Sequence, residues 1–67
     1  MTKVCYITDN TYKKQGKYTV TDNSVQFEAY STIYDLAVND SVLVSIPNSN
    51  YNGQKTILNK VVSDDIT

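Results

Sequence analysis

Few side chains in this sequence could take part in catalysis or metal binding. There is no histidine, the usual general base near neutral pH, and Cys5 is the single cysteine. A lone cysteine without histidine cannot supply the ligands of a zinc site, and it cannot form a disulfide within the chain. Cys5 lies in a segment of alternating residues, where a thiol is expected to act as a small core side chain.

Paired carboxylates are the remaining source of acid–base chemistry. Asp64 and Asp65 are adjacent, but they fall in a stretch that we expect to be a solvated tail. Asp35 and Asp40 flank a loop and are expected to cap turns. The glycine-containing segment NYNG, residues 50–53, lacks the pattern of a phosphate-binding loop. We therefore expect no enzyme, with no catalytic residue, no cofactor or cofactor-binding residue and no metal ligand.

Binding residues are easier to find than catalytic ones, because six tyrosines accompany a single phenylalanine. Tyrosine suits interfaces as well as half-buried positions, since one end is apolar and the other polar. We predict partner contacts at Tyr51, Asn48 and Asn50, in the loop at residues 47–53, and at Tyr34 in a second loop. Aromatic and asparagine side chains together would also suit a sugar. That composition is equally normal for a turn.

Length and charge narrow the classes of partner. The 67 residues make one domain, predicted to span residues 1–63, with residues 64–67 as a C-terminal tail or linker remnant. So short a chain has a marginal core and depends on good packing or on assembly with other chains. The formal net charge is −1, with six lysines and no arginine, which argues against a nucleic-acid surface.

Membrane and export signals are not evident in the sequence. No apolar run approaches the roughly 18 residues of a membrane span. The N-terminal MTKVCYITD reaches polar residues too early for a signal peptide. The single thiol is consistent with synthesis in a reducing cytoplasm.

Alternation of apolar and polar residues predicts five short strands, so the fold class is all-β. The predicted strands span residues 3–8, 17–21, 24–30, 41–46 and 54–58, the last continuing into residues 60–62. Closing so few strands into a small barrel would remove exposed edges. We expect a five-stranded OB-like barrel (the oligonucleotide/oligosaccharide-binding fold), with an SH3-like barrel as the alternative.

One hairpin can be assigned a register from the sequence. With Asp22-Asn23 as a two-residue turn, Val20 faces Val25 and Lys17 faces Glu28. This register sorts the side chains into two faces. The apolar face is Tyr18, Val20, Val25 and Phe27, and the polar face is Lys17, Thr19, Gln26 and Glu28.

The segment SVLVSI at residues 41–46 has apolar groups on both faces, which predicts a central or doubly covered strand. Val42, Val44 and Ile46 share the expected core face, and Leu43 lies on the other. Pro47 cannot donate to a sheet and should mark the end of the strand. Asn59 interrupts the last strand and suits a bulge.

The stretch DSVLVSIPNSNYNGQKTIL, residues 40–58, resembles a β-barrel segment of structural proteins in tailed bacteriophages. The similar pattern, Y…(G/N)D-x-V-x-V-x-I-P-N-x-(D/N)-Y-x-x-Q-K-T-I-(I/L)-(G/N)-K, runs from Tyr34 to Lys60. Residues 16–31 are similar to the strands that precede this segment. Asn39 and Asn59 stand where the pattern has glycine, and asparagine is the best substitute for glycine in a left-handed backbone.

The resemblance implies a non-catalytic structural and assembly module of a bacteriophage virion, of the tail or baseplate type. Such a module would be made in the host cytoplasm and would reside in the virion. Its partners would be other virion structural proteins or the rest of a longer parent chain. Two alternatives stay open: a carbohydrate-binding module for a host surface glycan, and an OB-type nucleic-acid binder, against which the charge argues.

Overall fold

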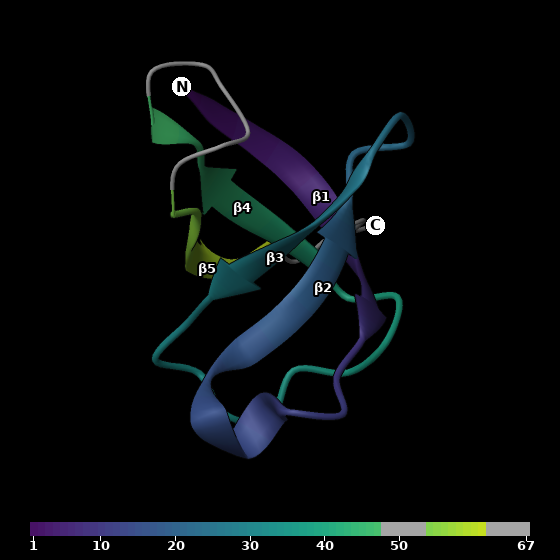
Figure 1. Cartoon of the computed structure of the whole chain (residues 1–67), viewed down its shortest axis with the longest axis vertical. Coiled ribbons are helices and arrows are strands. Elements are labelled where there is room, and N and C mark those ends of the chain that lie inside the picture. The colour runs from purple at the N-terminus through teal and green to yellow at the C-terminus, as the bar shows by residue number, and fades with distance from the viewer. Residues whose placement is uncertain (48–53, 62–67) are drawn as a thin grey trace, which may run out of the picture.

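Five strands form one mixed sheet that closes on itself in a barrel-like ring (Figure 1). In this computed structural model, residues 1–47 and 54–61 are described. The strands are β1 (Thr2–Asp9), β2 (Lys17–Thr21), β3 (Gln26–Tyr30), β4 (Ser41–Ser45) and β5 (Thr56–Lys60), and a short 3-10 helix, η1 (Lys13–Gln15), precedes β2. The predicted all-β class and five strands are confirmed.

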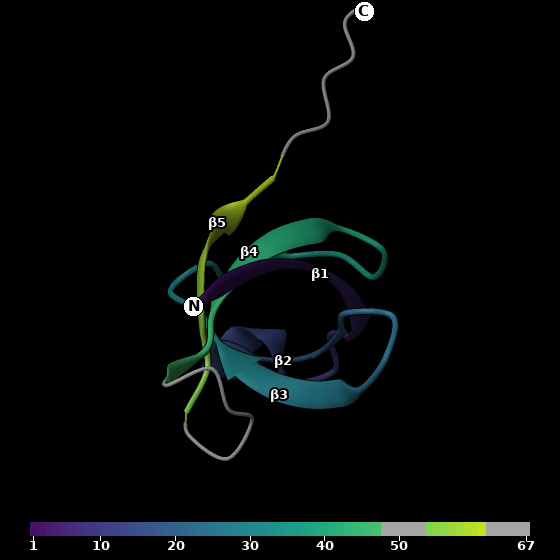
Figure 2. The same cartoon turned by 90° about the horizontal axis from the view of Figure 1, so that it is seen from above.

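The strands follow one another around the ring in the order β1-β2-β3-β5-β4, and β4 pairs back onto β1. The first three strands form an antiparallel meander, and β4 returns to lie beside β1, which is the 4-1-2-3 order of a Greek key. Only the β3–β5 contact is parallel, and the single residue pair Tyr30–Thr56 makes it. Figure 2 shows β1 and β4 on one side of the ring and β2 and β3 on the other.

Side chains alternate between the inside of the ring and its outside, except at the irregularities near Thr8 and Leu58. Inward side chains from all five strands, with two from the connecting segments, form one core. The buried apolar members are Cys5, Ile7, Tyr18, Val20, Ala29, Leu36, Val42, Val44, Ile46 and Ile57. The core face predicted for Val42, Val44 and Ile46 is therefore confirmed, and so is the core position of Cys5.

The segment between β3 and β4 crosses the end of the ring and is fixed there by Tyr18. The hydroxyl of Tyr18 donates to the carbonyl oxygen of Ile33 at 2.7 Å. It also accepts from the buried amide of Leu36 at 3.1 Å. Leu36 is thereby held against the core, with Ile33 packed beside it. One phenol group thus holds the connection that carries the chain from one side of the ring to the other.

The predicted two-residue turn at Asp22-Asn23 is wrong. Thr21 pairs with Gln26 and Val20 with Phe27, so the turn contains the four residues 22–25. The carboxylate of Asp22 explains the longer turn, because it accepts from the amides of Ser24 and Val25 at 2.8 and 3.0 Å. The error is an even number of residues, so the side chains keep their predicted faces.

The consequences of that register shift are small. Val25 leaves the predicted apolar face and is exposed in the turn, whereas Phe27 packs partly against the core. Lys17 now lies diagonally across from Glu28, and their charged groups still approach to 3.4 Å. Asp22 also ties the turn to β1, since Lys3 Nζ lies 2.7 Å from its carboxylate.

The two asparagines that replace glycine in the motif behave differently. Asn39 has a φ of 77°, so its predicted left-handed backbone is confirmed. Asn59 lies within β5 and has no positive φ, so that part of the prediction is wrong. The register of the β4–β5 pairing does shift beside it, because Val44 pairs with Ile57 and Leu43 with Asn59. Leu58 is the additional residue, so a bulge relieves the backbone without a left-handed residue.

The strand ends agree with the sequence in part. β4 ends at Ser45, two residues before Pro47, as a proline requires. In the connection between β3 and β4, Ala37–Asp40 form a tight turn, in which the Asp40 amide donates to the Ala37 carbonyl oxygen at 3.1 Å. The predicted tail at residues 64–67 lies outside the described residues.

Candidate functional site

The partner contacts predicted from the sequence can be located only at Tyr34. Its side chain is 54% exposed, and its ring approaches Gly16 in the loop before β2. Tyr51, Asn48 and Asn50 lie outside the described residues. The contact predicted for the loop at residues 47–53 therefore stays a prediction. The described residues form two other candidate surfaces, which the sequence did not indicate.

The outward positions before Asp9 on β1 and before Lys60 on β5, and all those on β4, carry no charged side chain, whereas Asp9 and Lys60 at the two strand ends are charged and exposed. Those positions, here called the uncharged wall, are Thr2, Val4, Tyr6, Thr8, Ser41, Leu43, Ser45, Thr56, Leu58 and Asn59. The chain has 13 charged residues, of which Lys3, Asp9 and Lys60 lie in these three strands. A run of outward positions without charge between the strand ends is unusual for a solvated surface. Depletion of charge is the compositional mark of the centre of a protein interface.

An apolar row crosses the middle of the uncharged wall. Val4 on β1 pairs directly with Leu43 on β4. Leu58 on β5 stands beside Asn59, the residue that pairs with Leu43. Val4 and Leu58 are each 50% exposed, and Leu43 is half-buried between them. The bulge at Leu58 brings this side chain to the outside of the ring, where it extends the row.

The outer surface of β2 and β3 has the opposite character. Its outward side chains, here called the charged wall, are Lys17, Thr19, Thr21, Gln26, Glu28 and Tyr30. Lys17 Nζ and the Glu28 carboxylate form an ion pair at 3.4 Å across the two strands. Lys17 Nζ also lies 5.5 Å from the centre of the Tyr12 ring. This wall carries charges that remain hydrated, as expected of a solvent-facing sheet.

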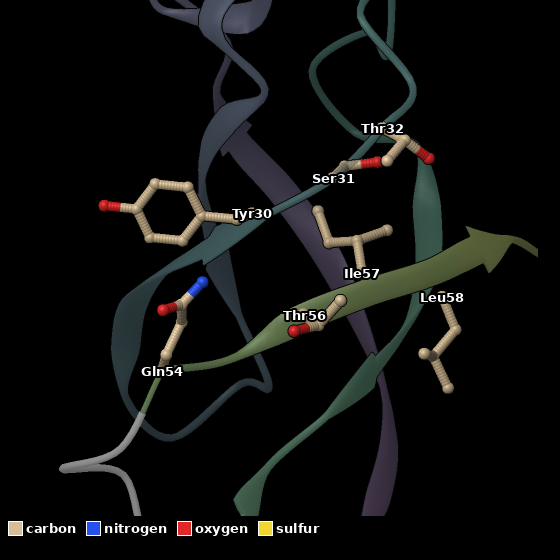
Figure 3. A pocket seen from close by; sticks show the side chains of 7 residues that line it. All are labelled: Tyr30, Ser31, Thr32, Gln54, Thr56, Ile57 and Leu58. Atoms are coloured by element: carbon tan, nitrogen blue, oxygen red, sulfur yellow. The ribbon is translucent and has the colours of Figure 1, made fainter.

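A groove lies where the two walls meet, along the single parallel contact of β3 with β5 (Figure 3). It is open on its outer side and has a volume of about 280 Å³. Its lining is Tyr30, Ser31, Thr32, Gln54, Thr56, Ile57 and Leu58. The groove exists because β3 ends at Tyr30 whereas β5 continues to Lys60, so the two strands separate after one residue pair.

The titratable groups do not form a catalytic arrangement in the described part of the chain. The Cys5 thiol is fully buried, and burial, assisted by the nearby negative charge of Asp22, raises its pKa. A raised pKa keeps the thiol protonated and therefore a poor nucleophile. The pKa of Asp9 is lowered, because its carboxylate accepts from the hydroxyl and the amide of Thr11 at 2.6 and 2.9 Å.

Asp40 is held by two structural partners. Asp40 accepts from the amide of Ala37 at 2.9 Å, which confirms its predicted role in capping a turn, and it lies 3.5 Å from Lys60 Nζ. Within residues 1–47 and 54–61, no cluster of three or more metal-ligating side chains occurs. Over the same residues, no helix has the length and apolarity needed to cross a membrane.

Sequence reasoning did not find the apolar row or the groove. Two signals of the apolar row were present. The alternation of the first strand places Val4 and Tyr6 on the face opposite Cys5 and Ile7, and Leu43 gives the 41–46 segment an apolar residue on its outer face. Nothing in the sequence indicated that β3 and β5 would meet, because 25 residues separate their facing ends, Tyr30 and Thr56.

Comparison with protein-family models, with curated proteins and with solved structures finds no match for this chain.

Proposed function

We propose that this chain is a non-catalytic structural module that acts through protein–protein contact at its uncharged wall. The observation that carries the proposal is the row of Val4, Leu43 and Leu58 in the middle of a three-strand surface that bears charge only at the ends of its described strands. Exposed apolar patches of this kind mark interaction sites, whereas a surface adapted to water carries mixed charges.

The partner that this wall fits best is a second copy of the same chain. When two identical surfaces meet around a twofold axis, a residue near the axis meets its own copy, so a charge there would face its like. An uncharged surface avoids this repulsion, so the composition of the wall suits contact with itself. Face-to-face packing of two such walls would give the layered arrangement of a β-sandwich, with side chains of both layers interleaved.

In finer terms, the fold is best assigned to the OB type. A meander of three strands, a fourth strand returning beside the first and a fifth closing the ring make a five-stranded Greek-key barrel. The parallel β3–β5 contact argues against the SH3-like alternative, whose neighbouring strands pair antiparallel. The OB type is widespread and does not by itself assign a function.

A tailed-phage virion is the setting that we propose for this module, and the motif resemblance over residues 16–60 supports it. Virion proteins present in many copies assemble through repeated contacts, which agrees with a wall that binds the wall of a second copy. Portal, tail and lysin genes beside the gene for this chain would support the setting. Unrelated metabolic genes beside it would contradict the proposed phage setting but would leave the proposed wall contact untouched.

The wall contact can be mapped in solution by amide NMR spectra recorded over a dilution series. Self-association through the uncharged wall should move the resonances of β1, β4 and β5 with concentration, while those of the charged wall stay fixed. Thr19 on β2 and Leu43 on β4 are matched reporters, because both are half-buried outward positions in the middle of a strand. Concentration-dependent shifts at β2 and β3 alone would contradict the proposal.

A further inference from the structure

The groove between β3 and β5 combines one aromatic ring with several uncharged polar groups. Tyr30 stands at one end with 40% of its surface exposed. In Figure 3 the side chain of Gln54 points towards this ring, and Thr56 follows beside it on β5. The hydroxyls of Ser31 and Thr32 lie along the opposite side, with Ile57 between the two rows.

We infer that this groove is a binding site for a neutral saccharide. A pyranose ring has an apolar face and a rim of hydroxyl groups, and the groove offers a partner for each. The exposed face of Tyr30 can stack against the apolar face of the sugar. The amide of Gln54 and the hydroxyls of Thr56, Ser31 and Thr32 can both donate to and accept from the rim.

The absence of charge from the lining selects a neutral sugar over other ligands. None of the described lining residues is ionisable near neutral pH. A nucleic-acid strand would need lysine or arginine beside the aromatic ring, and an acidic sugar would need the same. Lys55 is next in sequence to Gln54, but it is buried on the inner side, with Nζ 5.6 Å from the centre of the Phe27 ring.

The shape of the groove also favours a sugar. Sites for apolar ligands enclose most of the ligand, and their volumes are about 300–1,000 Å³. This groove, at about 280 Å³, is slightly smaller than that range and is open to solvent. It cannot enclose an apolar molecule, whereas a sugar can leave its outer hydroxyls hydrated. The volume and openness suit one or two pyranose rings of a longer chain.

This site is independent of the proposed assembly wall in its main contacts. Tyr30 belongs to β3 and Gln54 precedes β5, and neither belongs to the apolar row. Thr56 and Leu58 are the residues that the uncharged wall and the groove share. A saccharide could therefore bind at the Tyr30 end even if the wall had no partner. The wall could likewise bind a partner even if the groove bound no saccharide.

Saturation-transfer-difference NMR on the full chain tests the inference. The probes are cellotriose, maltotriose and N,N′,N″-triacetylchitotriose, each at millimolar concentration. We expect transfer to the ring protons on one face of at least one of these sugars, together with shifts of the Tyr30 ring resonances. Tyr30→Ala should abolish the transfer, and the backbone spectrum of the variant should show that the ring of strands is intact.

Tyr12→Ala is the matched control, because Tyr12 is an exposed tyrosine outside the groove. It should leave the transfer signals unchanged. Tyr30→Phe should also keep them, because the stacking face remains. The inference is overturned if none of the three sugars shows transfer, or if transfer persists undiminished in Tyr30→Ala. It is equally overturned if Tyr12→Ala removes the signals as completely as Tyr30→Ala does.

Discussion

The two outer walls of the ring are built from similar strands and differ in one property. Both present threonines between larger side chains, and both cover the same core from opposite sides (Figure 2). The charged wall places Lys17 and Glu28 next to each other in solvent. The uncharged wall places Val4, Leu43 and Leu58 at equivalent outward positions.

The difference between the outer surfaces is not needed for folding of the single chain. Both walls contribute buried apolar side chains to the core, so the core gives no reason for the outer surfaces to differ. Apolar outward residues contribute little to the stability of an isolated sheet, because water still reaches them. Their gathering on one wall agrees with the contact that we propose for it, and the ion pair on the other wall agrees with a surface that faces water.

The largest effect should come from exchanging an inner for an outer position on the same strand. Val44→Asp should leave the chain unfolded, because a buried unpaired charge costs several kcal/mol, comparable with the ~5 kcal/mol stability expected of so small a domain. Leu43→Asp, one residue away and half-buried on the outer face, should stay folded and lose about 1 kcal/mol. Far-UV circular dichroism and thermal melting compare the two variants.

Equal losses in both variants would show that β4 is covered on both sides within the single chain. In that case the wall would be part of the fold rather than a contact surface, and the comparison would fail.

The link between the two walls can be weakened at Tyr18. Tyr18→Phe removes the hydroxyl that bonds Ile33 and Leu36 and leaves the buried amide of Leu36 without this acceptor. Such a loss costs about 1–3 kcal/mol. Chemical denaturation should show this decrease in the free energy of unfolding, whereas Tyr34→Phe, at an exposed ring, should change it little. An unaltered midpoint for Tyr18→Phe would mean that the connection is held by packing alone.

The pKa and reactivity of the Cys5 thiol measure how well water is excluded from the inner side of the uncharged wall. Its folded pKa is raised, so the native state keeps the thiol proton at pH values where the unfolded chain loses it. Stability should therefore fall as the pH rises from the ordinary thiol pKa, about 8.5, through the raised value. Iodoacetamide should label the native protein far more slowly than the unfolded one. Rapid native labelling at pH 8 would contradict the burial, and Cys5→Ser provides the unlabelled control.

The smallest effect is expected on the charged wall. A double-mutant cycle with Lys17→Ala and Glu28→Ala should give a coupling of about 0.2–1 kcal/mol that decreases with added salt, because both groups are hydrated. Measuring the cycle at low and high salt tests this. A coupling well above that range and insensitive to salt would show the wall to be shielded from water, which would remove the contrast with the other wall.

The sequence correctly predicted those features that depend on a single strand or on a contact between near neighbours in the chain. Alternation identified the five strands and the inward row of β4, and residue chemistry identified the left-handed backbone at Asn39. The hairpin turn was placed wrongly because the Asp22 side chain competes for amides that a two-residue turn would not expose. The bulge predicted at Asn59 is present beside it, at Leu58, but it forms without the left-handed backbone expected of Asn59.

The candidate surfaces could not be predicted because they depend on contacts between distant segments. The apolar row requires β4 to pair with both β1 and β5, and the groove requires β3 and β5 to meet at one residue pair. Composition and periodicity give no register for such pairings. The tyrosines were recognised as potential contacts, but the sequence did not single out Tyr30, the one that lines the groove.

Sedimentation velocity on the purified chain tests the central claim, that the uncharged wall is a protein contact, most directly. From about 1 μM to about 1 mM, the range of weak to moderate association, the wild-type chain should shift from monomer to dimer. Leu43→Lys should remain monomeric, because a charge placed in the apolar row must lose its hydration on contact. Thr19→Lys, at the matched position of the charged wall, should dimerise like the wild type. A wild-type chain that stays monomeric throughout, or a Leu43→Lys variant that dimerises unchanged, would contradict the account.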